Sequence, residues 1–546
     1  MQLAEEGRLD LDANINVYLK EFQIPATYSE PITFRDLMAH TPGFEDLAIG
    51  GRVFVRDASD VMPLDEYLEE KMPARVRPPG EVTAYSNYGS TLAAYIIEQV
   101  LGKPFDEYVE ENILHPLDMD NTTFDQPLPS RLAPYMSNGY VYSNNAYTAK
   151  PFEYLQAWPA GSMSSTSEDM AKFMIAHLQK GRYDNTSILD EATAKQMHSQ
   201  LFTNDPKVNG MAYGFWEIRL NNQSMILHGG DTILFHTILV LIPESNLGLF
   251  ISANEQSSEP AVYELLQTFM DRNYPVPPPP VPEPIPEFEE NVSQFSGSYR
   301  PTRSAYTNFE KLGALFQEIQ VSSGPNSTLT MSQPGLGQEQ WVEVEPLVFS
   351  PAAGLPSQDG RVFGRDDQGR INHLFLKLNP TTTYEKVAWH DDANLNFALL
   401  GVCILLFLST LIWPAGSILN RYYAKPVNHT DTGRRYAGRR RSQAARWLAG
   451  GSSMLNLLFL AGLLSLFLAS PIEAEFIYTI PAWLTALMAI VLISAVLALG
   501  SAVFAALAWK DGYCSTAGRV HYTLVALALL AFVWWLNNWN LPGFKL

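Results

Sequence analysis

The stretch PPGEVTAYSNYGSTLAAYIIEQVLG, residues 78–102, leads from a proline-glycine turn into a long amphipathic helix. The opening Pro-Pro-Gly predicts the turn, and the apolar side chains that follow recur at the three- and four-residue spacing of a helix. Either Ser86 or Asn87 can cap the start of this helix. The polar triplet Tyr85-Ser86-Asn87 is therefore expected at the junction between loop and helix.

A phenol and a carboxamide at such a junction have a possible chemical use. Beside the outward-pointing N–H groups of a helix start, Tyr85 can act as a general base and Asn87 as a substrate clamp. The alternative is an N-cap next to a packed tyrosine, without chemistry. Because Tyr-x-Asn is a short pattern, the stretch taken alone favours this structural interpretation.

Length and composition limit the class of protein. The 546 residues are 47% hydrophobic, enough for two or three domains with large cores. An excess of 57 acidic over 37 basic residues argues against nucleic-acid binding. The two cysteines, Cys403 and Cys514, lie in or next to long apolar runs, so no disulfide, cysteine nucleophile or cysteine metal ligand is expected in the polar part of the chain. We expect no cofactor and no metal.

The first 274 residues predict an α+β domain, a helical part packed on an antiparallel sheet. Helical patterns come first and a meander of strands follows. The strands are expected at Tyr213–Leu220, Ser224–His228, Phe235–Ile242 and Leu247–Ala253. His40 precedes a Thr-Pro-Gly turn and is expected to be structural.

The segment His228-Gly229-Gly230-Asp231 is expected at the end of a strand. Paired glycines there leave room for a substrate against the strand edge. A bulge or turn that needs two glycines explains the pattern equally well.

A proline-rich linker at 275–290 and a small all-β module at 291–390 follow the first domain. Proline at this density predicts an extended polyproline spacer. Strands of the module are expected at Ser327–Met331, Trp341–Phe349, Arg361–Gly364 and Ile371–Leu378. No catalytic constellation is visible in the module.

Four apolar runs, at 395–416, 448–470, 479–508 and 522–539, predict a four-helix transmembrane region over 395–539. The loop after the first run is rich in arginine, whereas the loop after the second carries Glu473 and Glu475 and no basic residue. By the positive-inside rule the arginine loop is cytoplasmic and residues 1–390 are extracytoplasmic. Anionic lipid or nucleic acid is an alternative partner for the arginines. The basic residues are Arg421, Lys425, Arg434, Arg435, Arg439, Arg440, Arg441 and Arg446.

Four motifs together resemble the serine beta-lactamase and penicillin-binding-protein-like family, especially its class C and esterase branch. They are LMAHTPGF at 37–44, PPGEVTAYSNYG at 78–89, PAGSMSSTSEDMAKF at 159–173 and LHGGDT at 227–232. Their order and spacing match the family, and the resemblance covers about residues 1–274. It implies a helical domain on an antiparallel sheet and a site that combines Ser-x-x-Lys, Tyr-x-Asn and a Lys-Thr-Gly or His-x-Gly strand motif.

Carried over by motif, the resemblance implies catalytic roles for Tyr85 and His228. It implies substrate-binding roles for Asn87 and for Gly229, Gly230 and Asp231. No serine in the sequence has a lysine three positions on, so the family's nucleophile motif is absent from these 546 residues. In relatives that motif lies just before a stretch like residues 1–12, and the start of this sequence is therefore expected to be internal to a domain.

The sequence thus predicts a membrane-anchored extracytoplasmic serine hydrolase that acts on an ester or amide of a small molecule or peptide, as an esterase or a D-amino-acid peptidase. Since His228 replaces the lysine common in penicillin-recognising members, the charge at this position depends on pH, which favours an esterase or an unusual peptidase. The competing hypothesis is a noncatalytic membrane protein whose hydrolase-like domain binds cell-wall peptide or a protein partner.

Overall fold

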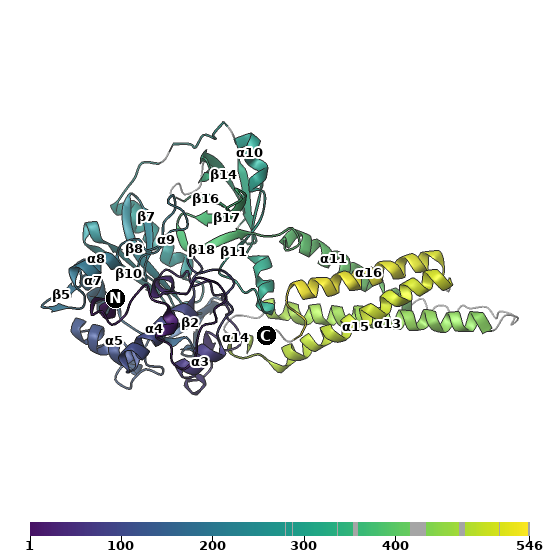
Figure 1. Cartoon of the computed structure of the whole chain (residues 1–546), viewed down its shortest axis with the longest axis horizontal. Coiled ribbons are helices and arrows are strands. Elements are labelled where there is room, and N and C mark those ends of the chain that lie inside the picture. Colours follow the sequence, from purple (N-terminus) through teal and green to yellow (C-terminus); the bar gives the residue numbers. More distant parts are fainter. Residues whose placement is uncertain are drawn as a thin grey trace. The chain divides into compact units, whose positions relative to one another are not determined.

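The computed structural model describes the chain apart from residues 279, 287, 336, 353–358, 415–432, 469–474, 513 and 544–546. These residues divide into two compact units (Figure 1). The hydrolase-barrel unit comprises 1–304, 316–386 and 477–479, and the membrane unit comprises 305–315, 387–476 and 480–546. The predicted class, α+β followed by an all-β module and four long apolar helices, is confirmed.

Local capping signals set the helix starts in the hydrolase part. Thr33 and Asp36 form a capping box at the start of α2 (Phe34–Met38). The Ser86 side chain caps α4 (Asn87–Leu101), and Gly102 ends α4 with a φ of 70°. Thr166 caps α7 (Ser167–Leu178). The other helices in this part are α1 (Gln2–Glu5), α3 (Leu64–Glu70), α5 (Phe105–Val109), α6 (Trp158–Gly161), α8 (Glu191–Met197) and α9 (Glu259–Asn273).

The predicted meander forms a four-stranded antiparallel sheet in the order β10-β9-β8-β7. The hairpin between the first two strands turns at Asn221-Asn222, both with positive φ. The glycine pair of the His-Gly-Gly-Asp segment lies inside β8, so the ladder continues through it to Asp231. The strands are β7 (Trp216–Leu220), β8 (Gln223–Asp231), β9 (His236–Ile242) and β10 (Leu247–Ala253).

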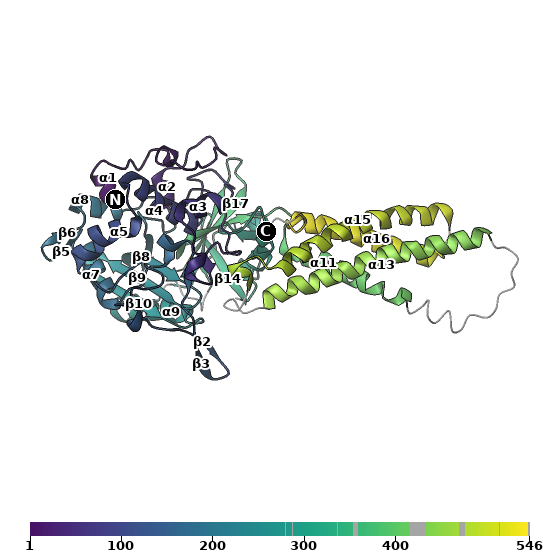
Figure 2. The ribbon, with the colours of Figure 1, turned by 90° about the horizontal axis from the view of Figure 1, so that it is seen from below.

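Both faces of this sheet are covered by helices. Alternate residues of β9 pack in opposite directions, Leu239 and Leu241 into the cluster that holds Met170 and Met174 of α7. Their neighbours Ile238, Val240 and Ile242 pack into a second cluster with Val262, Leu266 and Met270 of α9. A short hairpin, β2 (Gly139–Ser143) and β3 (Ala146–Lys150), projects from the same unit in Figure 2.

The all-β module is a closed eight-stranded barrel, teal to green in Figure 1. Pairing of β11 with β18 closes it, and α10 (Phe288–Phe295) buries Phe288 and Phe295 in the barrel core. Closure leaves no free sheet edge. The strands are β11 (Gly297–Pro301), β12 (Ile319–Ser323), β13 (Leu329–Gln333), β14 (Gly337–Glu345), β15 (Val348–Pro351), β16 (Arg361–Arg365), β17 (Ile371–Leu376) and β18 (Asn379–Lys386).

The prediction of one strand over Trp341–Phe349 is wrong. The chain turns back within this segment, and β14 and β15 form a hairpin in which Glu343 pairs with Phe349. Pro346, which has no N–H for a ladder, and Leu347, with a φ of 70°, make the turn. The Leu347 N–H donates instead to the Glu343 carboxylate, 2.9 Å away.

Among the described residues of the membrane unit, four helices are long and apolar enough to cross a bilayer. The candidate spans are Ala393–Pro414, Arg440–Leu466, Ala482–Asp511 and Thr516–Asn538. The first span covers α11 (Ala393–Ser409) and the residues just after it. The other three lie in α13 (Gly433–Leu468), α15 (Ala482–Asp511) and α16 (Thr516–Asn538), in that order. Of the predicted features, linker residues 279 and 287, run ends 415–416 and 469–470, and Arg421, Lys425 and Glu473 lie outside the described residues.

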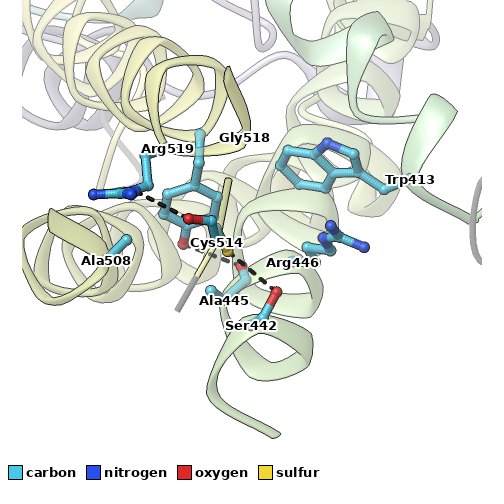
Figure 3. A pocket seen from close by; sticks show the side chains of 9 residues that line it. Trp413, Ser442, Ala445, Arg446, Ala508, Cys514, Gly518 and Arg519 are labelled. Carbon is cyan, nitrogen blue, oxygen red and sulfur yellow. Dashed lines mark hydrogen bonds between the residues drawn. The ribbon is translucent and has the colours of Figure 1, made fainter. Parts of the chain in front are cut away.

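Polar side chains tie these apolar helices together. Ser452 of α13 lies 2.9 Å from the Ser494 hydroxyl of α15, and Ser494 also bonds to Asn456. Figure 3 shows a small pocket in the same unit, lined by Trp413, Arg446 and Arg519 among others. There the Arg519 Nε donates to the Cys514 carbonyl, 3.0 Å away.

The cap of α7 gives a test of the local folding argument. Thr166→Ala removes the side-chain acceptor for the Asp169 N–H and should destabilise the hydrolase-barrel unit by about 1 kcal/mol. The adjacent Ser167→Ala is the matched control, because Ser167 is exposed and its side chain caps nothing; it should stay within about 0.5 kcal/mol of the unsubstituted protein. Thermal unfolding of both variants measures the difference, and equal midpoints would contradict the role of Thr166.

Candidate active site

Tyr85 lies at the junction predicted from the sequence, one residue before the Ser86 cap of α4. The Ser86 hydroxyl accepts from the Gly89 N–H at 3.0 Å, which fixes the helix start. The Tyr85 ring is partly buried, and its hydroxyl makes no hydrogen bond within the described part of the chain. Burial raises the pKa of this phenol, so Tyr85 is protonated at neutral pH.

Asn87 begins α4 two residues further on. Its carbonyl accepts from the Thr91 hydroxyl at 2.9 Å, while its side-chain amide has no hydrogen-bond partner among the described residues. Neither the Tyr85 hydroxyl nor the Asn87 side-chain amide is therefore engaged by another described residue.

His40 contacts the Tyr85 ring, with 4.1 Å between ring centroids. Its Nδ1 accepts from the Ser86 N–H at 3.2 Å, and its backbone has a φ of 54°. Burial lowers the pKa of His40 to about 3, so the ring is neutral. The sequence predicts only that His40 is structural. It does not predict the contact between the His40 and Tyr85 rings, through which His40 positions the tyrosine.

His228 of β8 faces the same ring, 6.1 Å away between centroids. Its Nδ1 lies 2.6 Å from the Gly229 carbonyl, so Nδ1 carries the proton and Nε2 is the acceptor of the neutral ring. Burial lowers the pKa of His228, and the Gly229 carbonyl and Asp231 only partly oppose this. His228 is therefore neutral at pH 7 and supplies no permanent charge.

The two glycines of β8 are required by close packing. A Cβ on Gly229 would lie 3.0 Å from the Trp216 ring and 3.1 Å from the Tyr263 hydroxyl, and one on Gly230 would lie 2.7 Å from the Thr237 hydroxyl. A larger residue at either position would therefore require these neighbouring side chains to move.

Asp231 ends β8 and pairs with a histidine that sequence analysis does not single out. Its carboxylate lies 2.7 Å from Nδ1 of the buried His236, whose Nε2 bonds to the Gln256 carbonyl at 3.1 Å. The structure thus brings Tyr85 and His228 together, with Asn87 and Asp231 on the adjoining segments.

The barrel holds the loop that carries Tyr85. The Tyr85 N–H donates to the Thr381 carbonyl of β18 at 3.0 Å, and Ala84 pairs with Thr382. The Thr302 hydroxyl donates to the Thr83 carbonyl at 3.0 Å. The Tyr85 loop and the barrel residues that it contacts all belong to the hydrolase-barrel unit.

The barrel also supplies a charged side chain that sequence analysis misses. The guanidinium carbon of Arg303 lies 4.8 Å from the centroid of the Tyr85 ring. No local pattern around Arg303 signals this, because the contact depends on how the barrel packs. Among the described residues, no three His, Cys, Asp or Glu side chains are grouped as a metal site.

Loss of one barrel contact should loosen the Tyr85 loop. Thr302→Val keeps the shape but leaves the Thr83 carbonyl and the Thr383 N–H without their hydroxyl partner. The unit should lose about 1–3 kcal/mol of stability. Hydrogen exchange at residues 83–86 should rise together with this loss. A destabilised variant with unchanged exchange in the loop would contradict the coupling.

Comparison with known proteins gives a family match to the first half of the chain. The beta-lactamase family model matches residues 1–267. Protein flp of Staphylococcus aureus (strain N315) is 26% identical over 277 residues, 49% of this chain and 52% of flp. Beta-lactamase-like protein 2 of Dictyostelium discoideum is 27% identical over 276 residues, 48% of each chain. The chain thus spans about half the length of these curated relatives.

Solved structures show similarity over a longer part of the chain. The match to a crystal structure of SurE includes 71% of this chain and 84% of the SurE chain, with 17% sequence identity and a TM-score of 0.49. The octameric penicillin-binding protein homologue from Pyrococcus abyssi covers 70% of this chain and 84% of its own, with 18% identity and a TM-score of 0.41.

Proposed function

Because residues 1–267 belong to the beta-lactamase family, we propose that the protein is a membrane-anchored extracytoplasmic serine hydrolase that cleaves an ester or an amide through an acyl-enzyme. The observation that carries the proposal is the Tyr85 ring, which lies against both His40 and His228 and whose hydroxyl, like the Asn87 side-chain amide, has no hydrogen-bond partner among the described residues. A tyrosine that only packs would need neither of the two imidazoles.

Each side chain has a role in this proposal. In the proposed mechanism the nucleophile is a serine of the family's Ser-x-x-Lys motif; no such motif occurs among these 546 residues. Tyr85 relays the proton of the attacking hydroxyl, and Asn87 orients the scissile ester or amide. Backbone N–H groups, including that of Asp231, hold the oxyanion.

The electrostatics define how Tyr85 works. Since burial raises its pKa, the phenol relays protons as a hydrogen-bond donor and acceptor, not as a standing phenolate. The neutral His228 accepts a hydrogen bond at Nε2 and can receive a proton during the reaction.

A noncatalytic binding protein is the second candidate. The observation that favours it is the absence of a Ser-x-x-Lys motif from the sequence. The free Tyr85 and Asn87 groups would then bind cell-wall peptide or a partner without cleaving it. Turnover by protein that includes the preceding motif separates the two candidates.

Tyr85→Phe tests the catalytic role, in protein extended at its N-terminus to include a Ser-x-x-Lys motif. The change keeps the ring and removes only the hydroxyl, so kcat for a p-nitrophenyl ester should fall roughly 10²- to 10⁴-fold with nearly unchanged thermal stability. Tyr95→Phe in α4 is the matched control, because the buried Tyr95 hydroxyl also has no hydrogen-bond partner within the described residues. A Tyr85→Phe enzyme with the kcat of the control would return Tyr85 to a packing role.

We also propose that the four apolar helices span the membrane, with the arginine-rich segment between the first two in the cytoplasm and residues 1–390 outside. Support comes from the charge difference between the loops and from tryptophans near the ends of the predicted runs. Those tryptophans are Trp413, Trp447, Trp483, Trp509 and Trp539.

Single cysteines test this topology in a background without Cys403 and Cys514. Thr432→Cys should be shielded from a membrane-impermeant maleimide in intact cells, because the positive-inside rule keeps its loop in the cytoplasm. Glu473→Cys should be labelled from outside. The opposite labelling pattern would reverse the orientation, and labelling of both positions would contradict the spans.

A further inference from the structure

The small pocket of the membrane unit is bordered by two arginines from different helices (Figure 3). Arg446 belongs to α13 and Arg519 to the first turn of α16, and Figure 3 shows the two side chains on opposite sides of Cys514. The pocket has a volume of about 40 Å³. That is room for roughly three water molecules, so the pocket can take a small polar group but no acyl chain.

Contacts between the helices hold the walls of the pocket in place. The Tyr522 hydroxyl donates to the Ala445 carbonyl at 3.1 Å, and the Tyr522 ring stacks on the Trp413 ring with 6.0 Å between centroids. The Ser442 hydroxyl lies 3.4 Å from the Cys514 sulfur. Because these contacts fix the walls without help from a ligand, little conformational entropy is lost when a ligand binds.

Both arginines keep hydrogen-bond donors for an anion. Arg446 is exposed and makes no ion pair or hydrogen bond with another described residue. The Arg519 Nε donates to the Cys514 carbonyl, and its guanidinium carbon lies 5.3 Å from the Trp509 ring centroid. The Nη groups of Arg519 have no hydrogen-bond partner within the described part of the chain. Guanidinium Nη groups are well suited to phosphate oxygens.

The acidic side chains of these helices do not balance the positive charge. Asp511 is the only acidic residue in the sequence ranges 433–468 and 482–538, and it pairs with Arg441 at 2.6 Å. The same two ranges hold eight basic residues, an excess that favours an anion from outside the protein. They are Arg434, Arg435, Arg439, Arg440, Arg441, Arg446, Lys510 and Arg519.

Tryptophans beside both arginines mark the depth of lipid headgroups. Arg446 precedes Trp447, which is 82% exposed, and Arg519 lies over Trp509, which is 48% exposed. Exposed tryptophans near the ends of membrane spans lie at the boundary between the hydrocarbon core and the headgroups. Arginines at the same level meet lipid phosphates, and the cytoplasmic leaflet, which this end is proposed to face, is the one rich in anionic lipid.

We infer that this pocket binds the headgroup of an anionic phospholipid, whose phosphate oxygens accept hydrogen bonds from Arg446 and Arg519. Because the two arginines border the pocket from opposite sides, a headgroup with two phosphates, as in diphosphatidylglycerol, offers one phosphate to each. The assignment rests on the proposed membrane spans, since only then do the arginines lie at the level of the phosphates. It gives the membrane unit a specific ligand in addition to its proposed anchoring role.

Lipid titrations of the full chain in detergent test this assignment. The probes are tetraoleoyl diphosphatidylglycerol, dioleoyl phosphatidylglycerol and dioleoyl phosphatidylcholine, and native mass spectrometry counts the lipids bound. One diphosphatidylglycerol should bind roughly 10- to 100-fold more tightly than phosphatidylcholine, with phosphatidylglycerol between them. Arg446→Gln and Arg519→Gln should each weaken diphosphatidylglycerol binding roughly 10-fold. Arg440→Gln is the matched control, because Arg440 is an exposed arginine of α13 that does not line the pocket; it should change the affinity less than about twofold.

Three results would overturn the assignment. Equal affinity for diphosphatidylglycerol and phosphatidylcholine would remove the headgroup preference. An Arg440→Gln effect as large as that of Arg446→Gln would assign the binding to overall charge. Displacement of the lipid by excess inorganic phosphate would assign the pocket to a soluble anion. If Arg519→Gln does not fold, Arg446→Gln decides the test, because the exposed Arg446 side chain has no partner whose loss would unfold the helices.

The lipid site and the membrane topology fail separately. Binding in detergent does not depend on orientation, so a missing headgroup preference together with the expected cysteine labelling would overturn the lipid site alone. A preserved preference together with the opposite labelling would overturn only the proposed orientation.

Discussion

The backbone pairing between the Tyr85 loop and strand β18 is the contact on which the site depends. The Tyr85 N–H cannot join the helix that follows it, so it would be left unpaired without the Thr381 carbonyl, 3.0 Å away. The same pairing sets where the phenol lies and brings Arg303 to it. A barrel without an evident catalytic constellation thus becomes part of the site, because it satisfies backbone groups that the hydrolase part leaves free.

In the proposed mechanism Tyr85 and His228 handle the proton, whereas the permanent charge beside Tyr85 is that of Arg303. Burial keeps His40 and His228 neutral, so they can orient and accept hydrogen bonds around Tyr85 without placing a fixed charge there. Arg303 stays charged because Asp46 pairs with it and because part of the side chain remains in solvent. His228, whose charge the sequence predicts to depend on pH, is therefore neutral at pH 7, and the cation next to Tyr85 is Arg303 of the barrel.

The membrane unit is stabilised by contacts of another kind. In the proposed membrane-spanning arrangement, lipid removes most of the hydrophobic drive for helix association, and small polar side chains take a larger part. Ser452, Asn456 and Ser494 link α13 to α15, and the Trp539 Nε1 donates to Asn396 at 3.0 Å.

The sequence by itself determined the helix start at Ser86-Asn87, the four strands of the sheet and the four apolar runs, because capping, strand periodicity and hydropathy act over a few neighbouring residues. Motif order was enough to select Tyr85, Asn87 and His228. Only the tertiary structure decided the β14–β15 hairpin, the packing that requires Gly229 and Gly230, and the contact of Arg303 with Tyr85. Those features depend on which unpaired backbone groups and side chains meet when elements distant in the sequence pack together. A local sequence pattern does not contain that information.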